Sequence, residues 1–301
     1  MENYLLAMAV FAGLYALMAL GLNVIWGLAG MVNLGLAGFF AVGAYASALL
    51  TVRLGWPVPL GWAAAALAAA AVGIVVALVT ARLRGDYLAI VTLGFAEVVR
   101  LVASNEIWLT GGTDGISGVP GPGRAALSAL DYNLLYAGLV WAAVAVVGGL
   151  LARLSRAPFG RVLRAIREDE MVAAVAGKRT LLFKVQAFAV GAGVLGLAGG
   201  LYAHFNAYVA PDAFTPLVTI YVVLALTAGG TGRMAGAVLG AVLVVALQEG
   251  TRFGADLVPG VSPVQAAALR AGAIGAALIL VLHLRPNGVL PEWNRRYGGQ
   301  P

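Results

Sequence analysis

MENYLLAMAVFAGLYALMALGLNVIWG (residues 1–27) opens the chain with one acidic residue, Glu2, and no basic residue. A cleaved signal peptide has a basic front and a shorter apolar core. A helix that crosses a membrane needs a run of about 20 apolar residues, which this stretch supplies. We therefore predict that it forms the first membrane span and is kept in the mature protein.

The whole chain has the composition of a membrane protein. Hydrophobic residues make up 61% of the 301 residues and charged residues 11%, whereas soluble domains have about 45–50% and about 25%. The 41 glycines suit closely packed membrane helices. Because there are no cysteines, disulfides and thiolate metal sites are excluded.

Apolar runs of near-spanning length recur along the sequence, and each could satisfy its own backbone in lipid as a helix. We predict an all-α polytopic membrane protein of about nine transmembrane helices (eight to ten), with 1–301 forming a single transmembrane domain. The range reflects two features: only Gly27 separates the first two runs, and the seventh is short. The runs are 4–26, 28–52, 60–81, 87–104, 133–152, 181–203, 214–228, 234–251 and 264–284.

Two runs contain glycine and polar interruptions, GLAGMVNLGLAGFF (27–40) and TAGGTGRMAG (227–236). Transporters place interrupted helices at substrate paths, where neighbours or a water-filled cavity satisfy the freed backbone. A re-entrant turn and a glycine packing seam are equally open interpretations. Gly196-x-x-x-Gly200 and Gly236-x-x-x-Gly240 indicate close helix contacts.

Polar residues inside apolar runs are candidates for the substrate path. Glu97 lies three residues before Arg100, so the two can pair on one helix face, either as a structural pair or on a translocation path. Asn33 and Thr92 are the other two path candidates, because each is polar in an apolar context. His204 is expected to anchor a helix end at the membrane interface, as is His283.

Basic residues predict the orientation. Residues 156–184, RAPFGRVLRAIREDEMVAAVAGKRTLLFK, hold seven of the 19 Lys and Arg. If this connection is cytoplasmic and the spans alternate, 14 basic residues fall on the cytoplasmic side and five on the other. The positive-inside rule then places the N-terminus outside and the C-terminus in the cytoplasm.

The same connection is predicted to contain two helical pieces. The first begins after the turn signal Pro158-Phe159-Gly160 and carries an apolar face of Val162, Leu163 and Ile166. The second, MVAAVAG (171–177), ends at Gly177, a natural helix stop. A solvated positive-inside loop explains the scattered arginines, but a short apolar face needs a surface to dock against.

Enzymatic motifs are absent from the sequence. There is no HExxH or GxSxG, and AGKRT (176–180) lacks the upstream glycine and has Arg179 where a P-loop requires Ser or Thr. Two histidines and no cysteine argue against a catalytic metal site. We expect no catalytic residues, no bound metal and no ATP site in this chain, and thus a non-enzymatic role.

Six collinear stretches resemble the permease subunits of ABC importers for branched-chain amino acids, and are most similar to the M-type permeases of the Liv system. The resemblance covers nearly the whole chain. The stretches are GLNVIWGLAGMVNLGLAGFFAVGAYASALL (21–50), RGDYLAIVTLGFAEVVRLV (84–102), LTGGTDGISGVP (109–120), GRVLRAIREDEMVAAVAG (160–177), LAGGLYAHFNAYVAPDAF (197–214) and RPNGVLPE (285–292).

The resemblance implies a coupling segment that seats in a groove of an ATP-binding subunit. This chain has Val172-Ala173-Ala174 where the general importer motif has Glu-Ala-Ala, and its nearest acid is Glu170. The residues implied to couple to the ATPase are Arg167, Glu168, Asp169, Glu170, Ala173, Ala174 and Gly177.

The resemblance also implies partners and a location. These are a second homologous permease subunit, two cytosolic ATPase subunits that carry ATP and Mg, and an external substrate-binding protein, in a bacterial inner membrane. ATP binding would switch the permease between outward- and inward-facing states. Urea or short-amide importers have similar permeases. From another class, a secondary transporter or channel would need no coupling helix, and an intramembrane enzyme ranks last.

Overall fold

The computed structural model describes residues 2–81, 83, 85–255, 265, 268, 272, 275, 276, 279, 280, 283, 288–290 and 292, with the backbone alone for 251–255. The elements in chain order are α1 (Glu2–Leu22), the π-helix η1 (Asn23–Leu28), α2 (Leu36–Arg53), α3 (Val58–Val79), α4 (Asp86–Asn105), α5 (Ile107–Thr110), η2 (Gly112–Asp114), β1 (Ile116–Ser117), α6 (Ala129–Arg156), α7 (Pro158–Glu168), α8 (Glu170–Val175), α9 (Thr180–Asn206), β2 (Tyr208–Val209), η3 (Pro211–Phe214), α10 (Pro216–Gly229) and α11 (Met234–Ala255).

Six helical segments of the described chain are long and apolar enough to cross a membrane. They are Glu2–Leu28, Leu36–Arg53, Val58–Val79, Asp86–Asn105, Ala129–Arg156 and Thr180–Asn206, with two shorter apolar helices at Pro216–Gly229 and Met234–Gly250. The all-α membrane class is therefore confirmed. The predicted number of nine spans is not reached among the described residues, and the last predicted span, 264–284, falls mostly outside them.

Both predicted interruptions are present, and the first changes the predicted second span. The helix that begins the chain ends at Leu28, residues 29–35 are not helical, and α2 starts only at Leu36. The predicted helix start at residue 28 is therefore wrong. The second break separates α10 from α11 at residues 230–233. With 14 residues, α10 is only about 21 Å long, which is shorter than a typical hydrocarbon core.

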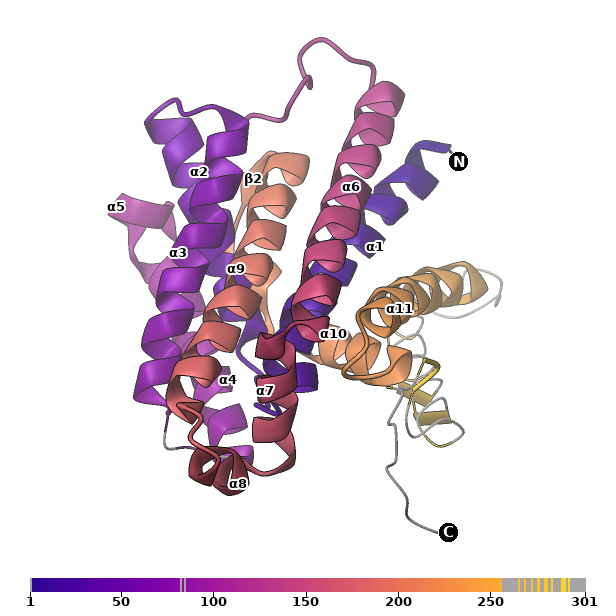
Figure 1. Cartoon of the computed structure of the whole chain (residues 1–301). Coiled ribbons are helices and arrows are strands. Elements are labelled where there is room, and N and C mark those ends of the chain that lie inside the picture. The colour runs from indigo at the N-terminus through magenta and orange to yellow at the C-terminus, as the bar shows by residue number, and fades with distance from the viewer. Residues whose placement is uncertain are drawn as a thin grey trace.

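The helices form an elongated bundle with two distinct ends (Figure 1). At one end, which we call the α8 end, the short helices α7 and α8 project beyond the long helices. The loop before α6 lies at the opposite end, and the N-terminus of α1 points toward it. There β1 pairs with β2 in antiparallel register, Ile116 with Val209 and Ser117 with Tyr208.

Glycines let α2, α3 and α9 pack backbone to backbone. A Cβ atom on Gly196 would lie 2.4 Å from the Ala65 carbonyl oxygen of α3, and one on Gly43 would meet the Gly196 backbone. A Cβ on Gly200 would lie 2.9 Å from that of Ala65. A Cβ on Gly240 of α11 would come even closer to the Ala225 carbonyl oxygen of α10. The predicted close contacts at both glycine pairs are confirmed.

His204 of α9 is fully buried, so the expectation that it anchors a helix end at the interface is wrong. Its Nδ1 lies 2.5 Å from the Pro120 carbonyl and its Nε2 lies 2.8 Å from the Ser47 hydroxyl. Because a carbonyl only accepts, Nδ1 carries the hydrogen and the Ser47 hydroxyl donates to Nε2. The imidazole thus joins α2, α9 and the loop before α6.

We expect Gly196→Val to destabilise the protein, because a branched side chain at this position has no space between α9 and α3. Overpacking of this kind costs about 1–3 kcal/mol. The measurement is the thermal midpoint of the purified protein in detergent. Gly138→Ala in α6 is the control, since a Cβ there meets nothing within 4 Å among the described residues. Equal midpoints for the two variants would contradict the packing argument.

Candidate functional site

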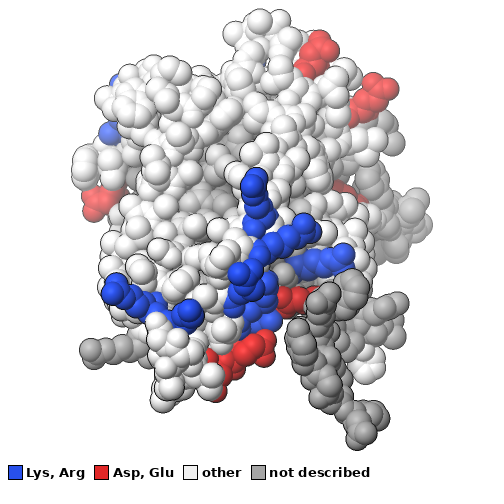
Figure 2. All heavy atoms as spheres, viewed as in Figure 1, with Lys and Arg blue, Asp and Glu red and all other residues white. Residues whose placement is uncertain are grey.

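The charged connection forms two short helices at the α8 end, as predicted. Figure 2 shows Lys and Arg gathered over this end of the visible face. Helix α7 starts at Pro158 itself, earlier than the predicted start after Gly160, because proline suits the first turn of a helix. Leu163 and Ile166 are buried against the bundle, so two of the three residues of the predicted apolar face pack inward.

Helix α8 is held by a cap at each end. The Asp169 carboxylate accepts hydrogen bonds from the backbone N–H of Met171 at 2.8 Å and of Val172 at 3.1 Å. At the other end the Gly177 N–H bonds to the Ala174 carbonyl and the Lys178 N–H to the Ala173 carbonyl. This is the Schellman arrangement, and Gly177 supplies the required left-handed conformation with φ 77°.

The outer face of α8 is apolar and solvent-exposed. Met171, Val172 and Val175 have exposed fractions of 67%, 64% and 88%. Ala173 is buried and lines a groove of ≈ 570 Å³ between α7 and α8, together with Val162, Ala165 and Ala176. Large apolar side chains presented beside a groove are typical of a surface that meets another protein.

The acidic and basic residues of this segment face different ways. Glu168 has an exposed side chain, whereas the side chain of Arg167 turns toward the bundle, with 21% exposed. Glu170 forms an ion pair with Lys184 at the start of α9, with 3.2 Å between Oε1 and Nζ. Ala174 and Gly177 are exposed. Sequence reasoning missed Lys184, which it counted only as a basic residue of the loop.

Two of the three path candidates come together at the first break. Asn33 and Thr92 are both fully buried. The Thr92 hydroxyl accepts from the Leu34 N–H at 3.1 Å, and the Asn33 side-chain oxygen accepts from the Gly35 N–H at 2.8 Å. These bonds fix the start of α2. The side-chain nitrogen of Asn33 has no hydrogen-bond partner among the described residues.

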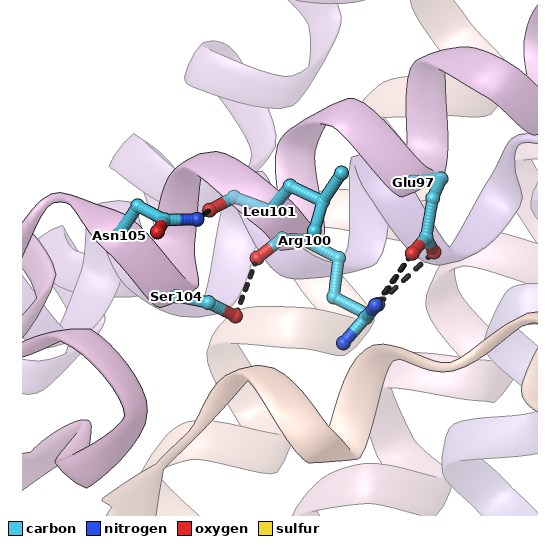
Figure 3. A network of polar contacts seen from close by, with 5 residues as sticks. All are labelled: Glu97, Arg100, Leu101, Ser104 and Asn105. Carbon is cyan, nitrogen blue, oxygen red and sulfur yellow. Dashed lines mark hydrogen bonds and ion pairs between the residues drawn. The ribbon is translucent and has the colours of Figure 1, made fainter.

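Glu97, the third path candidate, lies on a different face of α4 from Thr92, about 140° around the helix for five residues. It forms an ion pair with Arg100, with 2.5 Å between Oε1 and Nη2 (Figure 3). The side chains of Glu97 and Arg100 are 38% and 26% exposed. Helix α4, which carries the pair, packs against η3. The pair therefore stands on a partly open face near η3.

A metal centre has no structural support in the described part of the chain. No group of three or more His, Asp or Glu lies close enough there to hold an ion. The arrangement offers binding surfaces and a polar face within apolar helices. With six helices of the described chain long and apolar enough to cross a membrane, these features place it in the class of multi-pass α-helical membrane proteins.

Comparison with known proteins gives the family. Residues 4–282 match the family model described as branched-chain amino acid transport system, permease component. The high-affinity branched-chain amino acid transport system permease protein LivM of Escherichia coli (strain K12) is 34% identical over 94% of this chain and 69% of its own length. The probable permease protein LivM of Methanocaldococcus jannaschii is 29% identical over 93% of this chain and 91% of its own. No solved structure matches. This chain belongs to the family of branched-chain amino acid permease components and is a transport subunit rather than an enzyme.

We expect Asp169→Ala to loosen α8, because it removes the acceptor for two backbone N–H groups at the start of a six-residue helix. Loss of an N-cap costs about 1 kcal/mol, so hydrogen exchange at Met171 and Val172 should accelerate several-fold. Asp169→Asn is the matched control, since its side-chain oxygen still accepts. Identical exchange in the alanine variant and the parent protein would refute the capping role.

Proposed function

We propose that this chain is the permease subunit of an ATP-driven importer of branched-chain amino acids. Substrate would be delivered by an external binding protein and moved by alternating access. The observation that carries the proposal is the exposed apolar face of α8, on a chain whose family is the permease component of such systems. The face offers a contact through which an ATPase subunit can act on the permease.

The proposed assembly has this chain paired with a second homologous permease. Two ATPase subunits, which hold ATP and Mg, would bind at the α8 end. Residues 156–184 serve as the coupling loop of a single permease domain, 1–301. The Lys and Arg gathered over the α8 end (Figure 2) favour a cytoplasmic location for it. The N-terminus is then external, and a binding protein would dock on that side.

In the proposed mechanism α8 seats in a groove of the ATPase subunit. Its backbone is pre-ordered by the caps at Asp169 and Gly177, so little conformational entropy is lost on docking. The exposed Met171, Val172 and Val175 supply apolar contact area. Closure of the two ATPase subunits would move α7 and α8 together and bias the permease toward one of its two states.

Val175→Glu tests this contact, because residue 175 has the most exposed of the three apolar side chains and a carboxylate there would be desolvated on docking. We expect the variant to insert and fold normally but to lose co-purification with the ATPase subunits by about tenfold or more. Leu127→Glu, an exposed apolar position at the opposite end, is the control. Undiminished co-purification of Val175→Glu would place the ATPase contact elsewhere.

We further propose that the polar face of α4 lines the substrate path. A charge at the bilayer centre costs about 2.5–3.5 kcal/mol on insertion scales, so a partly exposed Glu97–Arg100 pair requires water or protein over it rather than lipid. A path at the boundary with the second permease would provide both. The opposite charges complement the carboxylate and ammonium of an amino acid. The break at Asn33 and Thr92, on another face of α4, is a second proposed part of the path, because the side-chain nitrogen of Asn33 has no hydrogen-bond partner among the described residues.

Substitutions that remove the charges distinguish a role of the Glu97–Arg100 pair in the substrate path from a purely structural ion pair. Glu97→Gln should lower uptake about tenfold while ATP hydrolysis by the assembled importer persists. If the pair were only structural, Glu97→Gln with Arg100→Gln would restore uptake, because removing both partners of an ion pair is often nearly neutral. We expect uptake to stay low in the double variant. Uptake is measured in proteoliposomes, where full transport without the ATPase would instead indicate a secondary transporter.

A further inference from the structure

The helix end at the first break, η1, contacts the second break, the turn between α10 and α11. The side-chain oxygen of Asn23 in η1 accepts a hydrogen bond from the Gly232 N–H at 2.8 Å. The side-chain nitrogen of Asn23 lies 3.4 Å from the Met234 sulfur at the start of α11. A Cβ on Gly27 would lie 2.6 Å from the Gly232 nitrogen. The end of η1 and the turn at 230–233 therefore form one contact.

Residues near the C-terminus complete this contact. The N–H groups of Val289 and Leu290 bond to the carbonyls of Ala228 and Gly229 at 2.8 and 2.9 Å, and so satisfy acceptors that a helix end leaves free. Glu292 then lies against the turn, because a Cβ on Gly232 would be 2.5 Å from its Oε2. The carboxylate of Glu292 thus belongs to the turn between α10 and α11.

Arg167 of α7 reaches both broken helices with one side chain. Its Nη1 lies 2.5 Å from the Gly27 carbonyl oxygen and 2.8 Å from Oε2 of Glu292. Its aliphatic stem packs on Gly30, where a Cβ would lie 2.7 Å from Cγ. The side chains of Arg167 and Glu292 are 21% and 22% exposed. The planar guanidinium can serve a carbonyl and a carboxylate together, which the single ammonium of lysine does less well.

We propose that Arg167 is a positioning residue for transport, which joins the coupling segment to both helix breaks. A displacement of α7 by the ATPase would be passed through Arg167 to η1 and, through Glu292, to the turn at 230–233. Both breaks would then move as one two-state element. This inference rests on the proposed function, and it assigns Arg167 an inward role rather than a contact with the ATPase.

The coupling ratio of the assembled importer tests the inference. In proteoliposomes, Arg167→Ala should keep its ATPase subunits and hydrolyse ATP, but move roughly tenfold less amino acid per ATP, a factor within the range typical of coupling between sites. Glu292→Gln, which removes only the ion pair, should lower the ratio in the same direction. Arg153→Ala, an exposed arginine near the end of α6, is the matched control. An unchanged ratio in Arg167→Ala, or loss of the ATPase subunits, would overturn the proposal.

A second measurement does not depend on transport. Because the chain has no cysteine, Met31→Cys introduces a single thiol at a buried residue that lines a cavity with Arg167. In the full chain in nanodiscs, Arg167→Ala and Glu292→Gln should each raise the rate of maleimide labelling of this thiol several-fold, and Arg153→Ala should not. Equal labelling rates with and without Arg167→Ala would show that Arg167 does not restrain the chain around the first break. This result would overturn the inference even if the importer functions as proposed.

Discussion

Where a helix is interrupted inside a bilayer, its backbone N–H and C=O groups lose their helical partners and have no water to bond with. The breaks at 29–35 and 230–233 place this chain under that constraint. The protein supplies the missing partners itself. Asn33, Thr92 and Asn23 each accept from a backbone N–H, and residues 289 and 290 donate to the last carbonyls of α10. These side chains and backbone groups hold each break in a defined shape.

Close packing elsewhere makes these defined breaks possible. Gly43 and Gly196 bring the backbones of α2, α3 and α9 into direct contact, and the buried imidazole of His204 fixes the end of α9 to the loop before α6. Interiors packed in this way have few intermediate arrangements, so a force applied at one end is transmitted rather than absorbed. Such a force can be applied at the α8 end, because part of the surface there is exposed.

The proposed coupling segment, formed by α7 and α8, has two faces with different chemistry. Outward, α8 presents Met171, Val172 and Val175 to solvent. Inward, α7 buries Leu163 and extends Arg167 to the broken helices. The ion pair between Glu170 and Lys184 ties the junction of these two helices to α9. In the proposed importer, the outward surface would bind the ATPase subunit, and the inward side chain of Arg167 would pass its displacement to the helix breaks.

The sequence alone determined the all-α membrane class, the positions of the two interruptions, the presence of two short helices in the charged connection and the Glu97–Arg100 pairing, because each depends on composition, periodicity or spacing within a few residues. It could not determine where α2 begins, since residues 29–35 are held by Thr92, which lies far along the chain. It misjudged His204 for the same reason, because the partners of His204 come from α2 and a distant loop. The inward direction of Arg167, and its link to Gly27 and Glu292, were decided only by the tertiary structure, which brings residues more than 100 positions apart within hydrogen-bonding distance.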